Sequence, residues 1–356
     1  MALKKLIESL PADIDGMLIE SPENRRYFTG FPSSAGILIV AKQGSVFLTD
    51  SRYIEAAKSQ ISCCEVVEQK KLEEQLPALA EKFGCKNLAF ETSRVTVARA
   101  RKLSKMLGGV RLADDDRADK IISQLRMVKT ADEIEKIKAA QRITERAFEH
   151  ILSIIKPGLT ERDIAFELDF YMLKNGAEAV AFDTIIASGV NSSKPHAVPS
   201  QKKVEDGDFI TLDFGAVVNG YRSDMTRTVA VGAVSEKQKN VYGIVLAAQL
   251  ETLRILKPGL PLKAADAAAR DIIRDAGFGS FFGHGTGHGV GIEIHEEPTL
   301  SPNGTGDLEP GNVVTAEPGI YLPGEFGVRI EDMALITADG CENLTHSTKE
   351  LLVVSG

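Results

Sequence analysis

Four acidic residues in the second half of the chain occupy matching places in an internal repeat. The aligned segments are VEDGDFITLDFG (204–215) with LEPGNVVTAEPG (308–319), and RSD (222–224) with RIE (329–331). The carboxylates that the alignment pairs are Asp213 with Glu317 and Asp224 with Glu331. Their neighbours are apolar, and a buried carboxylate is rarely left without a counter-charge. Four such groups brought together would repel one another, so the pattern predicts divalent cations between them.

The first acidic pair can be placed by the turn between its two strands. Asn219-Gly220 is typical of a two-residue hairpin turn, and counting back from it sets Asp213 opposite Thr226. Asp224 lies two residues from Thr226 and therefore shares its face of the hairpin. Asp213 and Asp224 become diagonal neighbours with Cβ atoms ~7–8 Å apart or somewhat less, which leaves room for a cation.

The stretch GHGTGHGVG (283–291) carries two histidines among five glycines. Glycine weakens helices and strands, so such a run suits backbone that bends or packs closely against something. The run fits neither the G-x-G-x-x-G dinucleotide loop nor the HExxH zinc helix. An ordinary glycine-rich loop with surface histidines is the alternative. With four carboxylates to neutralise, the pattern favours two metal ions and a nitrogen ligand from His284 or His288.

The elements that position these residues fall into two domains, and 356 residues are enough for both. The first part alternates short apolar runs with helical stretches, which predicts an α/β domain with a covered sheet. In the second part, IIKPGL and ILKPGL each open an amphipathic helix. This repeat predicts an α+β domain of two related halves about a pseudo-twofold axis. We place the domains at residues 1–127 and 128–356, because Thr130 and Glu133 form a capping box that opens a long helix.

The composition excludes several classes of partner. Apolar residues make up 43% of the chain and the formal net charge is −8, which argues against nucleic acid and an anionic membrane surface as partners. No apolar run approaches the length that spans a membrane, and the N-terminus does not resemble a signal peptide. The four cysteines form no C-x-x-C pair. We therefore expect a cytoplasmic protein with reduced thiols.

These motifs are similar to those of the pita-bread metallopeptidases, which include aminopeptidase P, prolidase and methionine aminopeptidase. The segments that carry the resemblance are LDFGAVVNGYRSDMTRT (212–228), GHGTGHGVGIEIHEEP (283–298), TAEPGIY (315–321) and GVRIED (327–332). The metal ligands that it implies are Asp213, Asp224, His288, Glu317 and Glu331. It also implies that Asp224 and Glu331 bridge both ions. RRYFTGF (25–31) and TDSRYIEA (49–56) resemble the N-terminal domain of aminopeptidase P and prolidase, which methionine aminopeptidase lacks.

The resemblance also implies a mechanism. Two ions would share a water, lower its pKa and polarise the scissile carbonyl. Glu317 resembles the general base that takes the proton from this water. His196 and His295 match histidines that hold the substrate and stabilise the tetrahedral intermediate, and His284 matches a third histidine of the substrate pocket.

Two further groups of residues have roles only through the resemblance. Arg329 and Tyr321 match partners of the ligand carboxylates, although an ordinary strand and turn would explain them about as well. Ser51, Arg52 and Tyr53 match a motif that lies near the active site of a neighbouring subunit. The resemblance therefore implies a homodimer or a larger homo-oligomer.

The predicted function is that of an exopeptidase with two divalent metal ions, which hydrolyses the Xaa-Pro bond at the N-terminus of peptides as aminopeptidase P does. Its substrates would be peptides with proline at the second position. The oxygen-rich ligand set favours manganese, with cobalt, iron and zinc as other candidates. One alternative is an Xaa-Pro dipeptidase, or prolidase. The other is a non-catalytic peptide-binding module on the same fold, whose relatives have replaced the ligands that this chain keeps.

One position bears on the choice between aminopeptidase and dipeptidase. A dipeptidase must recognise the free carboxylate that follows its proline, and arginine is suited to that task. Prolidases that resemble this chain carry an arginine four residues past His295, where this chain has Thr299. The sequence therefore favours the aminopeptidase, unless Lys202, Lys203 or a neighbouring subunit supplies the charge.

Overall fold

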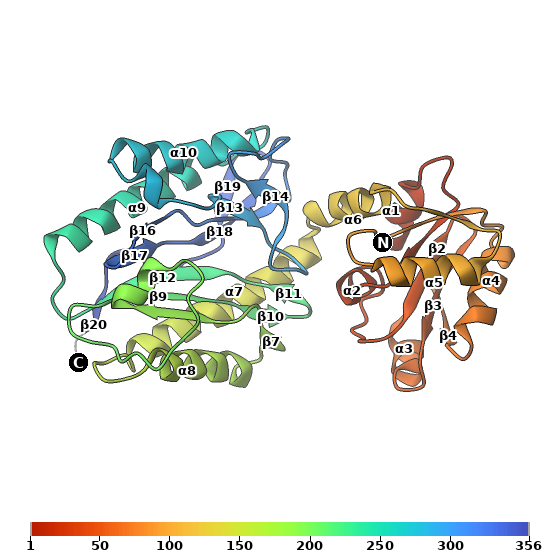
Figure 1. Cartoon of the computed structure of the whole chain (residues 1–356), viewed down its shortest axis with the longest axis horizontal. Helices are drawn as coiled ribbons and strands as arrows, with labels where there is room; N and C mark the ends of the chain where they lie inside the picture. Colours follow the sequence, from red (N-terminus) through yellow and green to blue (C-terminus); the bar gives the residue numbers. More distant parts are fainter. Residues whose placement is uncertain (1, 355–356) are drawn as a thin grey trace. The chain divides into compact units, whose positions relative to one another are not determined.

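The computed structural model describes residues 2–354, which form two compact units (Figure 1). The first unit ends at Arg126 and the second begins at Met127. All four cysteines are free thiols. None of the helices in the described residues combines the length and apolar character needed to cross a membrane.

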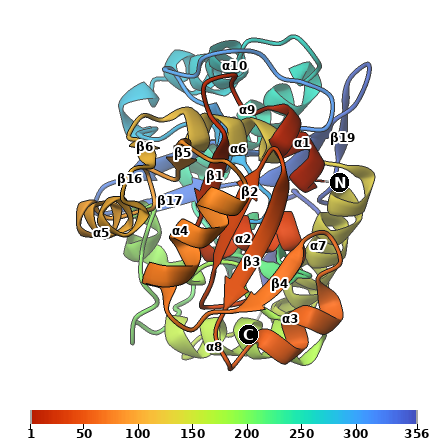
Figure 2. The same cartoon turned by 90° about the vertical axis from the view of Figure 1, so that its right-hand side faces the viewer.

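The first unit is a six-stranded mixed sheet with helices on both faces, as the sequence predicted (Figure 2). Its strands in spatial order are β4 (Glu65–Glu68), β3 (Gly44–Thr49), β2 (Ile37–Ala41), β1 (Gly16–Ile19), β5 (Asn87–Phe90) and β6 (Arg111–Ala113). The helices on one face are α4 (Leu72–Lys82) and α5 (Val97–Leu107), and those on the other are α1 (Ala2–Glu8), α2 (Pro22–Thr29), α3 (Ile54–Gln60) and α6 (Arg117–Met127). Side chains of β1 alternate between the two cores, with Leu18 in one and Met17 and Ile19 in the other.

The described part of the second unit contains four α-helices and four sheets. The helices are α7 (Ala131–Leu152), α8 (Glu161–Lys174), α9 (Glu236–Ile255) and α10 (Leu262–Asp275). The four-stranded sheet has the order β20 (Val353–Val354), β12 (Met225–Val231), β9 (Phe209–Phe214) and β8 (Ile185–Ser188). The five-stranded sheet has the order β14 (Glu296–Leu300), β13 (Gly287–Gly289), β15 (Val313–Ala316), β18 (Asp332–Ile336) and β19 (Cys341–Asn343). The smaller ones are β11 (Tyr221–Arg222), β10 (Ala216–Val218) and β7 (Ala179–Val180), and β16 (Gly319–Leu322) with β17 (Phe326–Arg329). Short 3-10 helices lie at Gly189–Ser193 and Gly279–Phe281.

The second unit has the two related halves that the sequence repeat predicted. Figure 1 shows its strands between α7 and α8 on one side and α9 and α10 on the other. The predicted capping box is confirmed, since the Thr130 side chain accepts from the Glu133 amide and the Glu133 side chain binds the Thr130 amide. A second box, from Thr160 and Asp163, opens α8.

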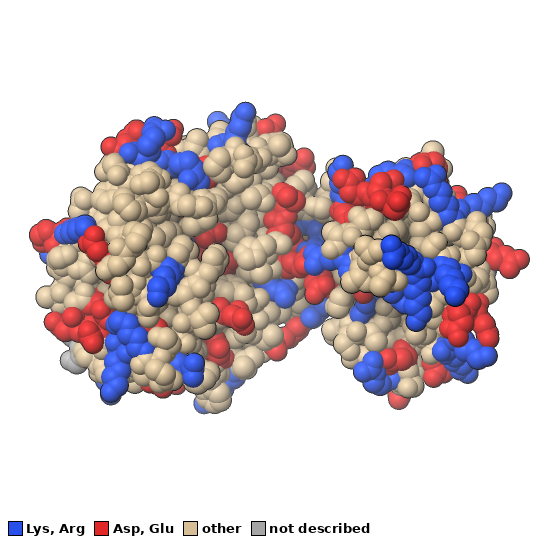
Figure 3. Space-filling view, viewed as in Figure 1, with Lys and Arg blue, Asp and Glu red and all other residues tan. Residues whose placement is uncertain are grey.

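Basic and acidic side chains are mixed over the face of this unit shown in Figure 3.

The hairpin that carries the first acidic pair has the predicted register. Asn219 and Gly220 form its turn, both with positive φ, and Asp213 pairs with Thr226 across β9 and β12. The second half differs in detail. There β15 and β18 pair as far as Ala316 and Asp332, so that Glu317 and Glu331 each adjoin this terminal pair. The amide of Glu331 donates to the carbonyl of Thr226 at 3.1 Å, which joins the two halves beside all four acidic residues.

Candidate metal centre and active site

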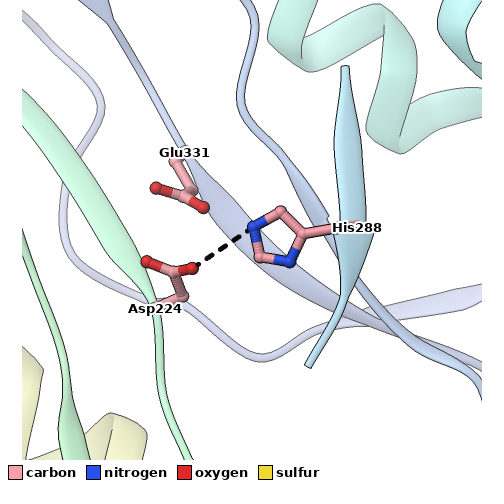
Figure 4. Close-up of side chains that lie close together, drawn as sticks. All are labelled: Asp224, His288 and Glu331. Atoms are coloured by element: carbon pink, nitrogen blue, oxygen red, sulfur yellow. Dashed lines mark ion pairs between the residues drawn. The ribbon is translucent and has the colours of Figure 1, made fainter. Parts of the chain in front are cut away.

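The structure brings the five predicted ligands to one place from both halves of the second unit. Asp213 lies near the end of β9, Asp224 precedes β12, His288 is in β13, Glu317 follows β15 and Glu331 precedes β18. One side-chain ligand atom from each of Asp224, His288 and Glu331 lies within 4.8 Å of the other two (Figure 4). The Nε2 atom of His288 is 3.6 Å from Asp224 Oδ2 and 3.3 Å from Glu317 Oε1.

The electrostatics of this cluster fit cations. Among the described residues, Asp213 Oδ1 and Glu331 Oε1 are buried with no hydrogen-bond partner, which is costly for a carboxylate. Burial and the neighbouring carboxylates raise the pKa of Asp224 and that of Glu331 well above the usual range. Burial by itself would lower the pKa of His288, but its hydrogen bond to Glu317 and the surrounding negative charge raise it. The four carboxylates outnumber the one arginine in the described part of the chain that contacts them, Arg329, and divalent metal ions would supply the missing positive charge.

The imidazole of His288 is oriented by backbone contacts. Its Nδ1 lies 3.1 Å from the carbonyl oxygen of Gly289, an acceptor to which Nδ1–H can donate. Donation from Nδ1 leaves the Nε2 lone pair facing the carboxylates, the arrangement in which a histidine binds a metal ion. The His288 amide donates to Thr315 Oγ1 at 3.0 Å. This hydrogen bond ties β13 to β15 at His288 itself.

The glycines around His288 allow close packing, as the sequence predicted. A Cβ atom on Gly287 would lie 2.0 Å from the carbonyl oxygen of Thr315, and one on Gly289 would lie 2.4 Å from that of Glu297. Both distances are far shorter than atoms can approach. Only glycine therefore lets β13 fit between β14 and β15 and carry His288 to the cluster.

Two residues of α10 that hold this stretch were not predicted from the sequence. Asp266 is buried and accepts from the amide and hydroxyl of Thr286 at 3.0 and 2.9 Å. Arg270 pairs with Asp266 and donates to the carbonyl oxygens of Phe282 and His284 at 3.1 and 2.7 Å. The available signal was an acidic and a basic residue four apart on an alanine-rich helix, a pattern that is also common on surfaces.

Arg329 and Tyr321 lie directly behind the predicted ligands. Arg329 is buried and pairs with Asp213 Oδ2, while its Nε donates to Thr226 Oγ1 at 3.0 Å and its Nη1 to the Tyr321 hydroxyl at 2.8 Å. Burial raises the pKa of Tyr321 to about 12, so its hydroxyl keeps its proton. Thr226, for which the sequence predicted no role, donates its hydroxyl proton to Glu331 Oε2 at 2.6 Å.

The three pocket histidines differ in what their rings contact. His295 is exposed, and its ring centroid lies 4.4 Å from that of His288. His196 is exposed on the loop after β8. In His284, by contrast, both ring nitrogens are engaged, Nδ1 with the Gly285 carbonyl at 2.8 Å and Nε2 with the Tyr321 hydroxyl at 2.9 Å. Direct substrate binding by His284 stays a prediction, and this geometry suits support of Tyr321 better.

A cavity of about 580 Å³ opens over the five residues. Its apolar wall contains Phe182, Ile185, Val198 and Ile294, and the side chain of Val198 stays 82% exposed. His196, His295 and Thr299 also line the cavity. A volume of this size accommodates a small ligand such as a short peptide.

Comparison with known proteins agrees with this geometry. Residues 135–338 match the model of metallopeptidase family M24, and residues 3–128 match the creatinase/prolidase N-terminal domain. An Xaa-Pro dipeptidase of Pyrococcus horikoshii is 40% identical over 98% of both chains. The structure of an Xaa-Pro dipeptidase from Bacillus anthracis matches with a TM-score of 0.95 at 42% identity, over 99% of both chains. An X-Pro aminopeptidase from Thermotoga maritima matches with a TM-score of 0.91 at 40% identity, over 99% of this chain and 100% of that one. The chain therefore belongs to metallopeptidase family M24 and has its pita-bread fold.

Proposed function

We propose that this protein is an Xaa-Pro dipeptidase that works with two divalent metal ions. The observation that carries the proposal is a cluster of four carboxylates and one imidazole, with Asp213, Asp224 and Glu331 buried, beneath a cavity large enough for a short peptide. The dipeptidases of Pyrococcus horikoshii and Bacillus anthracis, similar over nearly the whole chain, support proline-containing substrates. A non-catalytic binding module is disfavoured, because it would not need this complete set of ligands.

The residues that would hold the two ions are Asp213, Asp224, His288, Glu317 and Glu331. The family resemblance assigns Asp224 and Glu331 as the shared ligands, and a carboxylate oxygen of each lies within 4.8 Å of the other and of a ring nitrogen of His288. The unpartnered oxygens of Asp213 and Glu331 provide further positions for ligation. Four carboxylates with one imidazole favour manganese over zinc.

The chemistry that two bound ions supply is a lowered pKa for the attacking water and polarisation of the scissile carbonyl. Glu317 would accept the proton of this water at its carboxylate and pass it to the departing proline nitrogen. His295 and His196 line the cavity and would donate to the oxygen that gains negative charge. Arg329 would keep Asp213 in place through their buried ion pair.

The choice of dipeptidase revises the sequence analysis, which held it only as an alternative. The relatives named as dipeptidases favour it. Aminopeptidase activity is the second candidate for a specific reason, because Thr299 lines the cavity without offering a charge to a substrate carboxylate. The similarity to the Thermotoga maritima aminopeptidase supports the same candidate.

A matched dipeptide and tripeptide distinguish the two candidates. We expect kcat/KM for Ala-Pro to exceed that for Ala-Pro-Ala at least tenfold, about 1.4 kcal/mol of transition-state binding. We also expect Thr299→Arg to increase this preference, because its guanidinium can pair with the terminal carboxylate. Equal or faster cleavage of the tripeptide by the wild-type protein would make the chain an aminopeptidase. Thr299→Ser, which adds no charge, is the control.

A homodimer or larger homo-oligomer is also part of the proposal, on the family resemblance of residues 51–53. The Arg52 side chain is exposed and pairs with Asp50, and the Tyr53 hydroxyl hydrogen-bonds Ser34 Oγ at 2.8 Å. Light scattering on the purified protein would measure its mass in solution. A measured mass equal to that of a single chain at micromolar protein concentration would contradict the proposed homo-oligomer.

A further inference from the structure

A fully buried carboxylate outside the metal cluster binds both ends of the loop that carries His196. Glu161, the first residue of α8, is 0% exposed. Its Oε1 accepts from the amide and hydroxyl of Ser188 at 2.7 and 3.0 Å. Its Oε2 accepts from the amide and hydroxyl of Ser200 at 3.0 and 2.6 Å. The amide group of Asn191 donates to both oxygens, at 3.1 and 3.2 Å.

These contacts close residues 188–200 into a loop fixed at its base. Burial alone would raise the pKa of Glu161, but the donors from Ser200, Ser188 and Asn191 lower it, so the side chain is ionised at neutral pH. Hydrogen bonds to a buried carboxylate are stronger than those between neutral groups. Each end of the loop therefore depends on the same charged side chain.

The middle of this loop reaches the candidate active site. His196 and Val198 line the cavity, although both side chains are exposed. The carbonyl oxygen of Pro195 accepts from Nη1 of Arg329 at 3.3 Å, the arginine that also pairs with Asp213. The loop thus spans from a fixed base at Glu161 to the side chains behind the metal ligands.

We propose that Glu161 is a positioning residue that sets where His196 stands over the metal centre. This inference rests on the proposed peptidase activity, in which His196 donates to the charged oxygen of the reacting peptide. The exposed ring of His196 has little packing of its own to hold it. Its position must therefore come from the loop, which Glu161 holds at its base and which Arg329 and Gly327 contact at Pro195 and Ser192.

Glu161→Gln tests the role with little change of shape. A glutamine has one acceptor oxygen and one amide nitrogen, so its NH2 group must face the amide of either Ser188 or Ser200. Two donors then oppose each other, and one end of the loop loses its hydrogen bond to this side chain, while the backbone contacts of Ser188 and Ser200 remain. We expect kcat/KM for an Xaa-Pro substrate to fall about 10²-fold, the effect of misplacing a catalytic group by about 1 Å.

Asp163→Asn is the matched control on the same helix. Asp163 Oδ2 accepts from the amide and hydroxyl of Thr160 at 2.9 and 2.7 Å, and its side chain is exposed. Its replacement weakens the start of α8 but removes no contact of the 188–200 loop. We expect Asp163→Asn to keep wild-type kcat/KM. A similar loss of activity in both variants would show that Glu161 acts only through the stability of α8.

A double-mutant cycle with His196→Ala completes the experiment. If Glu161 acts through His196, the double variant is about as slow as His196→Ala alone. If the two losses multiply, the inference is wrong. Ser200→Ala removes one hydroxyl donor to Glu161, so we expect a smaller loss of kcat/KM that is likewise non-additive with His196→Ala. This variant replaces Glu161→Gln in the cycle if Glu161→Gln fails to fold. A wild-type protein without activity on any Xaa-Pro peptide would instead refute the proposed function.

Hydrogen exchange supplies a readout that does not depend on activity. We expect amides in the 189–200 segment to exchange faster in Glu161→Gln than in the wild-type protein, with or without added manganese. The exchange rates of amides in α8 should change more in Asp163→Asn than in Glu161→Gln. Unchanged exchange in the loop of Glu161→Gln would overturn the inference even if the activity fell.

Discussion

Glu331→Gln should leave the protein folded but with less bound metal and with its peptidase activity lowered by more than ~10²-fold. Glutamine keeps one oxygen that can accept from Thr226, but it replaces a carboxylate oxygen by an NH2 group that cannot bind a cation. Loss of a residue that hydrogen-bonds to a metal ligand typically lowers metal affinity or activity about 10–100-fold. Loss of a ligand shared by both ions should therefore lower them further. Metal content by mass spectrometry and turnover of Ala-Pro measure the two effects.

The next residue along the chain, the first of β18, provides a matched control with the opposite expected result. Asp332 is as deeply buried as Glu331, but it pairs with Arg227 at 2.7 Å and with Lys349. Asp332→Asn should cost about 3 kcal/mol of unfolding free energy, because it leaves buried positive charge uncompensated, while the metal content stays unchanged. Metal-free Glu331→Gln should unfold at no lower temperature than the metal-free wild-type protein, because it replaces a carboxyl group whose charged form is disfavoured by burial and by the neighbouring carboxylates. If Asp332→Asn lost its metal and Glu331→Gln kept it, the ligand assignment would be wrong.

His295→Ala should keep its metal and lose about 10²–10³-fold in kcat. Its ring borders His288 but is exposed to the cavity, where it can donate to a charged oxygen of the substrate. Removing one donor of this kind usually costs that factor. Partial desolvation of the ring at the cavity wall and the neighbouring His288 lower the pKa of His295, which keeps the ring neutral with one N–H to donate at neutral pH.

His346→Ala is the control for loss of an exposed imidazole. His346 lies in a polar segment after β19 and does not line the cavity, so its replacement should leave kcat unchanged. Loss of bound metal from His295→Ala would identify His295 as a ligand instead. Wild-type turnover by that variant would remove it from the catalytic machinery.

Local patterns allowed much of the second unit to be predicted. The Asn219-Gly220 turn sets the register of its hairpin within a few residues, so the pairing of Asp213 with Thr226 follows from counting. The capping box at Thr130 is also a local signal. In the first unit, β4 and β6 are short and partly exposed, so they lack the apolar runs that revealed the other strands.

The contacts that hold the site could not be predicted in the same way. Glu161 binds residues 27 to 39 positions away, and Asp266 binds a residue 20 positions away. Both look like ordinary helix-surface carboxylates in the sequence. Likewise, the engaged nitrogens of His284 depend on Tyr321, which lies 37 residues further along. Such side-chain contacts require the folded chain, because no spacing rule relates their partners.

The most direct test of the two-metal site is a crystal structure of the protein grown with manganese, with diffraction recorded at the manganese absorption edge. We expect two anomalous peaks in the cluster, both contacted by Asp224 and Glu331, with His288 bound through Nε2 to one of them. A single peak, peaks away from these residues, or no peak in a protein that cleaves Xaa-Pro peptides would contradict it.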